Sequence, residues 1–354
     1  MLLNEFLLIV QSLFPKELKL LDKIKNSNIT GSISENDLQR IIKNPVKTKA
    51  ISDYHNESFA KLEKKIKQSD IKLLFIYEES YPTLLKKGYG SPVVLFYKGD
   101  ISILNSKTIS IVGTRKPTLY GRKYASFFSE ELASIGITIV SGMARGIDTE
   151  AHKGALKKGK TIAVLGSNLE RIYPASNKKL FNRIIDNGCV ISEYSPSYPT
   201  FRSNFPIRNR IIAYISPLTF VVEAKRKSGS LITAYLANDA GRDVAALPAD
   251  ISKKISEGTN HLIKKGAFLI QETDDILSLL PYEVDRKAVK KPVLSSKDKE
   301  VLDLIPFDNI INFDNIVEKT KIPIGELFQI LLKLELNGEI NKIQGNNYQR
   351  RGIL

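Results

Sequence analysis

Basic, hydroxyl-bearing and small residues gather in four segments of the sequence. The segments are IVGTRKPTLYG (111–121), VSGMARGID (140–148), RSNFPIRNR (202–210) and EAKRKSGSLITA (223–234). Lys and Arg side chains, together with the backbone amides of glycine turns at helix starts, are groups that bind phosphate in proteins. The residue types in these segments therefore predict a site for an anionic ligand.

The first segment has a glycine at the point where an apolar run gives way to helical periodicity. Gly113 permits a tight turn, Thr114 and the amides of the turn predict a phosphate-binding nest, and Arg115 adds a planar cation. Tyr120 and Gly121 follow at the start of the helix. A glycine that only permits the turn is the alternative interpretation. The segment matches neither GxGxxG nor GxxxxGK[ST], which argues against a nicotinamide cofactor and a P-loop nucleotidase, and no cofactor is expected.

The second segment repeats this pattern with Arg145 before a predicted helix. Asp148, Glu150 and His152 in that helix suggest an acid–base set as one interpretation. Acidic residues in the first turn of a helix also complement its dipole and bind its free amides. We favour the capping interpretation for the two carboxylates.

The third and fourth segments add an aromatic ring and further cations. Cations alternating with an aromatic ring suit single-stranded nucleic acid, because the cations follow the backbone and the ring stacks on a base. Alternatively, Phe205 anchors its loop in the core; Arg210, inside a helix, is expected to be structural. The expected ligand-binding residues of these two segments are Arg202, Phe205, Arg208 and Asn209, and Lys227, Ser228, Gly229 and Ser230.

No chemical set typical of an enzyme stands out in these segments. We find no carboxylate pair, no nucleophile with a base and no metal-ligand spacing, and the three histidines lie far apart. The single cysteine, Cys189, excludes a disulfide within the chain. We therefore expect no catalytic residues and no metal.

An alternation of strands and helices positions the four segments. Predicted strands cover 108–112, 137–141, 161–165, 189–193, 218–222, 243–246 and 268–270, and predicted helices cover 119–135, 148–157, 177–187, 206–215, 230–240, 258–265 and 273–279. The strands are apolar throughout, as in parallel sheets that are covered on both faces. The predicted fold is α/β, an extended Rossmann-like doubly wound parallel sheet whose loops meet at one edge.

The rest of the chain divides into smaller parts. Residues 1–67 predict a small helical domain, with helices at 2–14, 16–26, 34–43 and 56–67, which serves as an interaction module or a lid. Within 68–280, the stretch 71–105 adds a strand, a short helix and a strand before the alternating region. Residues 281–294 predict a linker, and 295–354 a winged helix that contacts either DNA or protein.

Charge and hydropathy bound the environment. The 354 residues include 53 Lys and Arg against 38 Asp and Glu, a net charge of +15. This charge fits a polyanionic partner, and it also fits a composition that simply favours Lys. No apolar run of about 18 residues could span a bilayer, and the apolar start has helical spacing instead of a signal-peptide pattern. We expect a cytoplasmic protein without membrane contact.

Six motifs together resemble the bacterial DNA-processing protein A (DprA/Smf) family, in order over 71–280. They are IVGTRKPTLYG, IVSGMARGIDTEAH, AVLGSNLERIYPASN, FPIRNRIIA, VVEAKRKSGSLITA and GTNHLIKKGA. The resemblance implies a homodimeric, non-enzymatic protein that binds single-stranded DNA. It further implies that the protein protects incoming DNA during natural transformation and loads the RecA recombinase onto it. That family also has a sterile-alpha-motif-like helical domain in front and a winged helix behind.

The resemblance assigns DNA contacts to residues of three segments and one weaker position. The contacts fall on Arg115, on Arg202 and Phe205, on the turn 227–229, and less specifically on Lys178. The chain departs from the family pattern at Ala249 and Tyr214, where Gly is usual, and this bears on local packing only.

We place the dimer contact at an apolar surface near the end of the Rossmann-like region. The residues expected there are Leu262, Ile263 and Leu269.

Two other functions stay open from the sequence. One is a nucleotide-processing enzyme similar to lysine-decarboxylase-like proteins, which carry a Glu shortly after a glycine-rich turn. Ala234 and Leu236 occupy that helix turn here, so the carboxylate is absent. The other is a dimeric scaffold whose basic edge never meets DNA.

Overall fold

The computed structural model describes residues 1–27, 29–283, 294–307, 309–336 and 339–350. The chain forms two compact units, Met1–Asp285 and Arg286–Leu354. The predicted linker 281–294 lies mostly outside the described residues. No described helix is long and apolar enough to cross a membrane.

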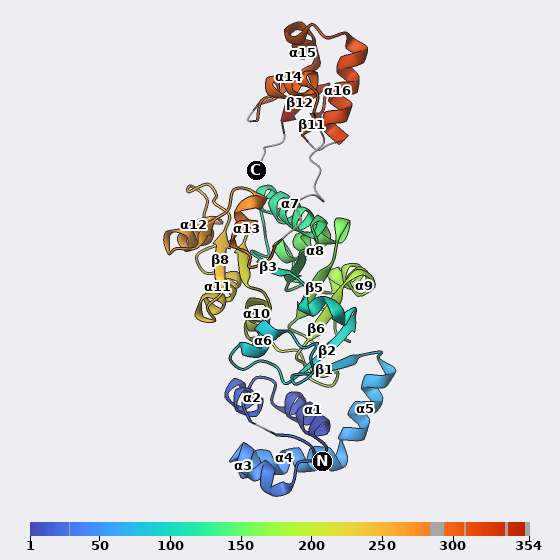
Figure 1. Cartoon of the computed structure of the whole chain (residues 1–354), viewed down its shortest axis with the longest axis vertical. Helices are drawn as coiled ribbons and strands as arrows, with labels where there is room; N and C mark the ends of the chain where they lie inside the picture. Colours follow the sequence, from blue (N-terminus) through green and yellow to red (C-terminus); the bar gives the residue numbers. More distant parts are fainter. Residues whose placement is uncertain (28, 284–293, 308, 337–338, 351–354) are drawn as a thin grey trace. The chain divides into compact units, whose positions relative to one another are not determined.

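The first unit begins with helices, drawn in blue in Figure 1. They are α1 (Leu3–Leu13), α2 (Leu18–Lys25), α3 (Glu35–Ile42), α4 (Pro45–Glu57) and α5 (Phe59–Gln68). The sequence interpretation missed α4 because it took Pro45 as a break. Pro45 is instead the first helical residue, where proline is well tolerated, and the Asn44 side chain accepts a hydrogen bond from the Lys47 amide at 3.1 Å.

These helices share a core with the sheet that follows. Gln11 of α1 is fully buried and donates to the carbonyl of Glu193 at 3.0 Å, while its oxygen accepts from the Val93 amide at 2.9 Å. The predicted domain boundary at residue 67 stays a prediction.

A nine-stranded sheet with order β1-β2-β6-β5-β4-β3-β7-β8-β9 organises the rest of this unit. Its strands are β1 (Lys72–Phe75), β2 (Val94–Gly99), β3 (Thr108–Val112), β4 (Thr138–Ser141), β5 (Thr161–Leu165), β6 (Cys189–Ser192), β7 (Leu218–Val221), β8 (Asp243–Ala246) and β9 (Phe268–Leu269). Strands β3 to β9 pair in parallel, which confirms the doubly wound prediction. The expectation of a wholly parallel sheet needs one correction, because β1 and β2 extend it in antiparallel pairing.

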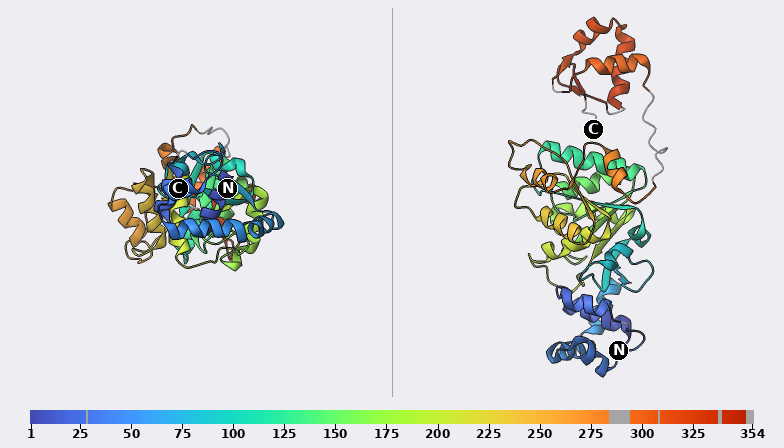
Figure 2. Two further views of the ribbon diagram at one scale, coloured as in Figure 1. Left: turned by 90° about the horizontal axis from the view of Figure 1, so that it is seen from below. Right: turned by 60° about the vertical axis from the view of Figure 1, so that its left-hand side comes forward.

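Helices cover both faces of this sheet (Figure 1), and Figure 2 shows the same layers from two further sides. They are α6 (Thr83–Lys87), α7 (Leu119–Ser134), α8 (Ile147–Lys158), α9 (Lys178–Asn187), α10 (Asn204–Ile215), α11 (Gly229–Asp239), α12 (Glu257–Lys264) and α13 (Thr273–Leu279), with 3-10 turns at Ile101–Asn105 and Ala175–Asn177. Because both faces are covered, β3 and β5 are buried along their whole length. The strand order runs outward from β3 in one direction through β4 and in the other through β7, which makes the β3–β7 gap the topological switch point.

The second unit is the predicted winged helix. It contains α14 (Ser296–Leu304), β10 (Ile311–Asn312), α15 (Phe313–Thr320), α16 (Ile324–Leu336), β11 (Ile340–Ile343) and β12 (Asn347–Arg350). The strands form a sheet of order β10-β12-β11, in which the short β10 was not expected from the sequence. Its own apolar core includes Leu302, Ile316 and Leu331.

Candidate functional site

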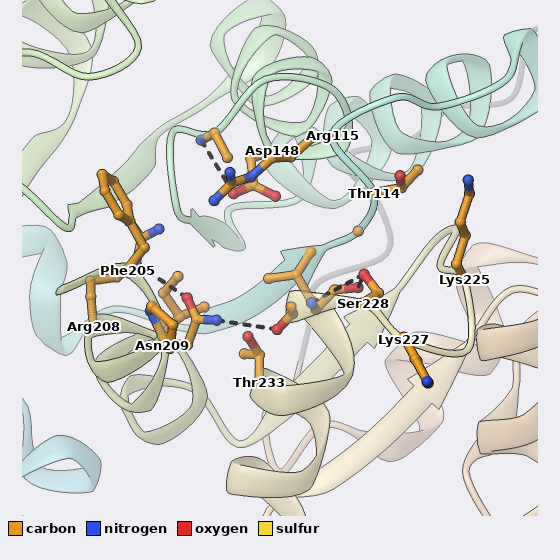
Figure 3. A pocket seen from close by; sticks show the side chains of 17 residues that line it. Thr114, Arg115, Asp148, Phe205, Arg208, Asn209, Lys225, Lys227, Ser228 and Thr233 are labelled. Atoms are coloured by element: carbon orange, nitrogen blue, oxygen red, sulfur yellow. Dashed lines mark hydrogen bonds between the residues drawn. The ribbon is translucent and has the colours of Figure 1, made fainter. Parts of the chain in front are cut away.

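A pocket of about 420 Å³ lies at the switch point, where the chain leaves β3 and β7 (Figure 3). In doubly wound sheets this is the place where ligands bind. The pocket is lined by Val112, Gly113, Thr114, Arg115, Ala144, Asp148, Phe205, Pro206, Arg208, Asn209, Ile212, Lys225, Lys227, Ser228, Gly229, Ser230 and Thr233. All four chemistry-bearing segments of the sequence therefore contribute to one cavity.

The turn after β3 is closely packed, so its glycine does more than permit a bend. A Cβ on Gly113 would lie 2.5 Å from Cγ1 of Ile147 and 2.9 Å from the carbonyl oxygen of Glu223. The Thr114 amide donates to that same carbonyl at 2.7 Å. The Thr114 amide is therefore not free to bind a phosphate, because it already donates to the neighbouring strand exit.

The first turn of α7 faces a buried carboxylate. The backbone amide and the hydroxyl of Thr118 donate to the Glu223 carboxylate at 2.8 and 2.7 Å. Gly121 leaves room for this group, since a Cβ there would lie 2.6 Å from Glu223 Oε2. The hydroxyl of Tyr120 donates to the carbonyl of Pro248 at 2.9 Å, and burial raises the pKa of this tyrosine to about 12. Tyr120 and Gly121 thus position α7 and do not line the pocket.

The start of α11, in contrast, opens into the pocket. Gly229 is exposed, no atom lies within 4 Å of where its Cβ would be, and no acidic residue occupies the first turn. Ser228 accepts from the Ser230 amide at 3.4 Å, and Asn209 of α10 donates to the Gly229 carbonyl at 3.2 Å. A helix start that is fixed in place, unshielded and free of carboxylates is a site for an anion.

Phe205 supplies an aromatic surface on the other side of the pocket (Figure 3). Its ring is half-buried, packs tightly over Gly166 and lies 5.1 Å from the ring of Tyr173. The Arg115 guanidinium carbon lies 6.0 Å from the Phe205 ring centre. Phe205 therefore anchors its loop, as one of the two interpretations of the sequence expected, and part of its ring still faces the pocket.

Arg208 was expected among the ligand-binding side chains, but its side chain is buried at the pocket floor. It is only 3% exposed and donates to the carbonyls of Gly142, at 2.7 Å, and Val164. Burial lowers the pKa of Arg208 to about 10, so the guanidinium stays charged at neutral pH. The geometry assigns Arg208 to holding the loops after β4 and β5.

Asp148 lies at the same floor and offers the opposite charge. A Cβ on Gly142 would lie 2.7 Å from Asp148 Oδ2 and 2.8 Å from Arg208 Nη2, so both groups crowd the same glycine. Asp148 accepts a hydrogen bond from the Ala144 amide at 3.3 Å, in the loop before α8, which is not an amide of the helix itself as the capping interpretation expected. Burial raises the pKa of Asp148 to about 6, although the Arg208 charge opposes that rise.

The acid–base set considered from the sequence does not converge. His152 is fully buried, and its Nδ1 lies 2.7 Å from the Thr161 hydroxyl in the core. Burial lowers the pKa of His152 to about 3. Glu150 pairs instead with Lys153 at 3.0 Å on the surface.

Several predicted residues lie outside the pocket. Arg145, Lys178 and Arg202 are all exposed at the same edge of the sheet: Arg145 in the loop after β4, Lys178 as the first residue of α9, and Arg202 in the loop before α10. Arg210 is buried and pairs with Glu193 at 2.7 Å, which confirms its structural interpretation.

The three residues expected at a dimer contact are placed differently from one another. Leu262 is 4% exposed and packs in the core, so its assignment to a dimer surface is wrong: the buried face of α12 carries it. Ile263 is half-buried against the same core, whereas Leu269 is 45% exposed on the edge strand β9.

The sequence interpretation also missed residues that the fold brings to the site. Asp148 was read only as a cap, and Thr233 and Tyr173 were not singled out. Thr233 follows Gly229 by one helical turn, and that spacing could have predicted it. Tyr173 lies in the loop after β5, which ends at the same edge as the other loops. Among the described residues no group of three or more His, Cys, Asp or Glu could hold a metal ion.

Comparison with known proteins identifies the family. The model of DNA recombination-mediator protein A matches residues 72–281, and that of the DprA winged helix domain matches 286–346. The chain belongs to the DNA recombination-mediator protein A family. Among curated relatives of this DprA/Smf family, Protein Smf of Escherichia coli is 38% identical over 285 residues, 77% of this chain and 76% of its own length.

Solved structures of the same family share the fold. DNA processing protein A from Streptococcus pneumoniae superposes with a TM-score of 0.73 at 33% identity, covering 80% of this chain and all of the other. DNA processing protein A from Helicobacter pylori, for which a single-stranded DNA binding mode is described, gives a TM-score of 0.54 at 32% identity. That match covers 59% of this chain and 94% of the Helicobacter chain.

Proposed function

We propose that the pocket binds single-stranded DNA and that the protein is a binding protein without catalytic activity, acting as a recombination mediator. The observation that carries this proposal is the convergence of three features on one cavity. These are the unshielded start of α11, the partly exposed ring of Phe205 and the exposed cations of Arg115 and Lys227.

Each feature takes a different part of a nucleotide. A phosphate accepts from the backbone amide of Gly229, where the helix dipole also favours negative charge. A base stacks on Phe205, and Arg115 and Lys227 neutralise neighbouring phosphates. Because a ring at the pocket wall reaches the face of an unpaired base only, this arrangement favours a single strand over a duplex.

The binding experiment is fluorescence anisotropy with a labelled dT oligonucleotide and a matching duplex over a salt series. We expect tighter binding to the single strand, with an affinity that falls steeply with salt. Arg115→Ala removes one cation from the pocket, so we expect weaker binding and a salt slope smaller by about 0.7.

Arg183→Ala is the matched control, because Arg183 is equally an exposed arginine but lies on α9 away from the pocket. Equal effects of the two substitutions, or preference for the duplex, would contradict the proposal.

The nucleotide-processing alternative makes a different prediction for the same pocket. In that class a carboxylate follows the glycine-rich turn, whereas α11 carries Ala234 and Leu236 there, and the buried Glu223 is engaged at the start of α7. Incubation with nucleoside monophosphates and chromatography of the products tests it; release of free base would favour the enzyme. A scaffold whose edge meets no DNA would show no binding even at low salt.

We further propose that the protein acts as a homodimer in the cytoplasm, protects incoming DNA during natural transformation and loads RecA onto it. The family described as DNA recombination-mediator protein A supports the class of role. RecA-dependent ATP hydrolysis on single strands coated with single-strand-binding protein tests the loading step. An unchanged lag before hydrolysis in the presence of this protein would count against it.

A further inference from the structure

A second aromatic and basic surface lies beside the pocket, on the loop after β5 and on the loop that leads into α10. We call Tyr173, Tyr198 and Phe201 the aromatic strip. Tyr173, on the first loop, is 52% exposed and lies against Phe205 of the pocket wall, with ring centres 5.1 Å apart. Phe201, on the second loop, is 47% exposed and lies edge-on to Tyr198, with ring centres 6.0 Å apart. The strip therefore consists of one ring beside the pocket wall and a pair of rings on the neighbouring loop.

The turn that begins α10 connects the pocket and the strip. The Asn204 amide donates to the Phe201 carbonyl at 3.1 Å, so Phe201 and Phe205 lie one turn of chain apart. Arg202 lies between them, is exposed, and forms no ion pair with any described residue. Rings one turn apart with a free cation between them repeat, outside the pocket, the pattern found at its wall.

The N-terminal helices supply a second cation to the strip. Lys16, in the connection between α1 and α2, places its Nζ 4.4 Å from the ring centre of Phe201 and 5.8 Å from that of Tyr198. The same ammonium group lies 2.9 Å from the Ser203 hydroxyl. The strip thus reaches from the sheet domain to the helical region of the first unit.

Contacts on both sides hold the loop in place. Tyr198 stacks on the buried Tyr194, with ring centres 5.3 Å apart, and its carbonyl accepts from Asn168 at 2.9 Å. Lys65 of α5 donates to the carbonyl of Pro196 at 3.2 Å. A loop fixed from two directions loses little conformational freedom when a ligand binds to it.

The carboxylates near the strip are already paired with other cations. Glu170 pairs with Lys65 at 3.1 Å, Glu17, next to Lys16, pairs with Lys47, and the buried Glu193 pairs with Arg210 at 2.7 Å. The charge that remains toward solvent at the strip is that of Arg202 and Lys16. This surface combines exposed ring faces with uncompensated positive charge, which suits the backbone and bases of a single strand.

A purely structural role explains only part of this arrangement. The contact between Lys16 and Phe201 would serve as a clamp between the helical region and the loop. Such a clamp does not explain why Tyr173 is exposed, nor why Arg202 forms no ion pair with the described residues. A ligand that extends from the pocket wall past Tyr173 to Phe201 and Lys16 would use both features.

We propose that a single strand longer than the pocket can hold continues over the aromatic strip toward the N-terminal helices, with bases on Phe201 and a phosphate at Lys16. This proposal rests on the proposed function and extends the site beyond it. Its ligand is an unpaired polynucleotide segment, recognised by stacking and charge without sequence preference.

The test compares a short dT oligonucleotide of about 5 nucleotides with a long one of about 15, lengths within the range of single-strand sites. The variant is Phe201→Ala. The control is Tyr77→Ala, a 48% exposed ring at the end of β1 that belongs to neither surface. We expect Phe201→Ala to bind the short strand like wild type and the long strand about fivefold to tenfold more weakly, the equivalent of one lost stacking contact.

Lys16→Ala provides an independent readout of the same path. We expect it to lower the salt slope for the long strand by about 0.7 and to leave the slope for the short strand unchanged. If both variants bind both lengths like wild type while Arg115→Ala weakens both, the strip carries no DNA and the pocket proposal stands. If wild type binds neither length, the pocket proposal itself fails, and this inference with it.

Discussion

Arg208 and Asp148 set the electrostatics of the pocket from below its surface. Both side chains are nearly fully buried, and they crowd the same glycine, Gly142. Arg208 stays charged at neutral pH, whereas Asp148, with a pKa raised to about 6, changes charge in a mildly acidic range. An ionised Asp148 opposes a phosphate in the pocket, and a protonated one does not.

We therefore predict that affinity for single-stranded DNA rises as the pH falls from about 7.5 to about 5.5. The expected gain is about threefold to tenfold, or about 1 kcal/mol, the size of one charge about 4 Å from a phosphate that stays in contact with bulk water. Asp148→Asn should bind more tightly at pH 7.5 and lose most of this dependence. Anisotropy titrations at fixed ionic strength measure it.

The pH dependence that Asp148 gives to folding stability is opposite in sign to that of most carboxylates, whose pKa is lowered by folding. Because the folded-state pKa of Asp148 lies above its ordinary value of 3.8, the folded state prefers the protonated form. The contribution of this group to stability is full below pH 3.8 and is lost as the pH rises through about 6. His261 is a second titratable group, with a pKa lowered from its ordinary value by desolvation and by the Arg226 charge, so His261→Gln is the control. A pH dependence that survives in Asp148→Asn and disappears in His261→Gln would contradict the assignment to Asp148.

At this scale the sequence predicted residue types better than residue roles. Arg115 and Gly229 line the pocket as expected, because their segments end at the same edge of the sheet. The burial of Arg208 could not be predicted from the sequence, because an arginine three residues after Phe205 is equally consistent with a second exposed cation. Only the packing of α10 over the ends of β4 and β5 turns it inward, where backbone carbonyls satisfy it.

Two helices, α7 and α11, follow the strands that flank the switch point, and they differ in what occupies their starts. The first turn of α7 faces the buried Glu223, whereas that of α11 has no carboxylate and opens into the cavity. Of these two starts, that of α11 offers a negative ligand a helix dipole with no facing carboxylate. The Thr114 amide of the predicted nest after β3 is engaged by the Glu223 carbonyl, although the sequence pattern around both glycines is alike.

Gly229→Ala tests the start of α11. Nothing lies within 4 Å of the added Cβ, so we expect the variant to fold with a free energy of unfolding equal to wild type or about 0.4–1 kcal/mol higher. The methyl group occupies the approach to the backbone amides, so affinity should fall about tenfold or more, as for one lost hydrogen bond to a charged group. Urea unfolding and anisotropy measure the two quantities separately.

Gly325→Ala is the matched control, because Gly325 also begins a helix, α16, and its added Cβ also meets no atom within 4 Å. An unchanged affinity in Gly229→Ala, or an equal loss in both variants, would show that the start of α11 does not bind the phosphate.

The elements themselves were largely predictable from the sequence. Runs such as TIAVL and CVIS are largely apolar along their whole length, which is the pattern of a strand covered on both faces. These runs form β5 and β6, and every residue in them is buried. The helix α4 was not predicted because the effect of Pro45 depends on its position. Proline prevents a helix from continuing, but it is favourable as the first helical residue, which is where Pro45 lies. The pairing direction of β1 and β2 could not be predicted, since apolar pattern does not encode direction.

The winged helix bears on how the whole molecule meets DNA. The exposed side of α16 carries Ile324, Phe328 and Leu332, which are 63%, 50% and 50% exposed and spaced by one helical turn each. Helices that read DNA present cations and polar groups to the grooves. Of the two roles that the sequence left open for this unit, its α16 surface favours protein contact over DNA contact.

For the homodimer, the edge strand β9 is the proposed contact, because Phe268 and Leu269 are 44% and 45% exposed and edge strands have unpaired backbone groups. We predict that wild type has twice the chain mass of 39.7 kDa in light scattering, and that Leu269→Arg shifts it toward the monomer. Val46→Arg, at a 79% exposed position on α4, should leave the mass unchanged. A monomeric wild type, or a dimeric Leu269→Arg, would contradict this placement.

The sequence predicted the division into a Rossmann-like region and a winged helix, because their periodicities differ. It placed Leu262 in an apolar surface at the dimer contact, and a pattern alone does not say which apolar side chains of a helix pack on the sheet. In the structure Leu262 is buried, whereas Phe268 and Leu269 of β9 are exposed.

The measurement that tests the central claim most directly is photo-crosslinking of the wild-type protein to a 4-thiothymidine oligonucleotide, followed by peptide mass spectrometry. The account predicts crosslinks in the segment around Phe205 and at the start of α11, with competition by unlabelled single strands but not by duplex. Crosslinks confined to α16 and the strands of the winged helix, with none at the β3–β7 switch point, would contradict it.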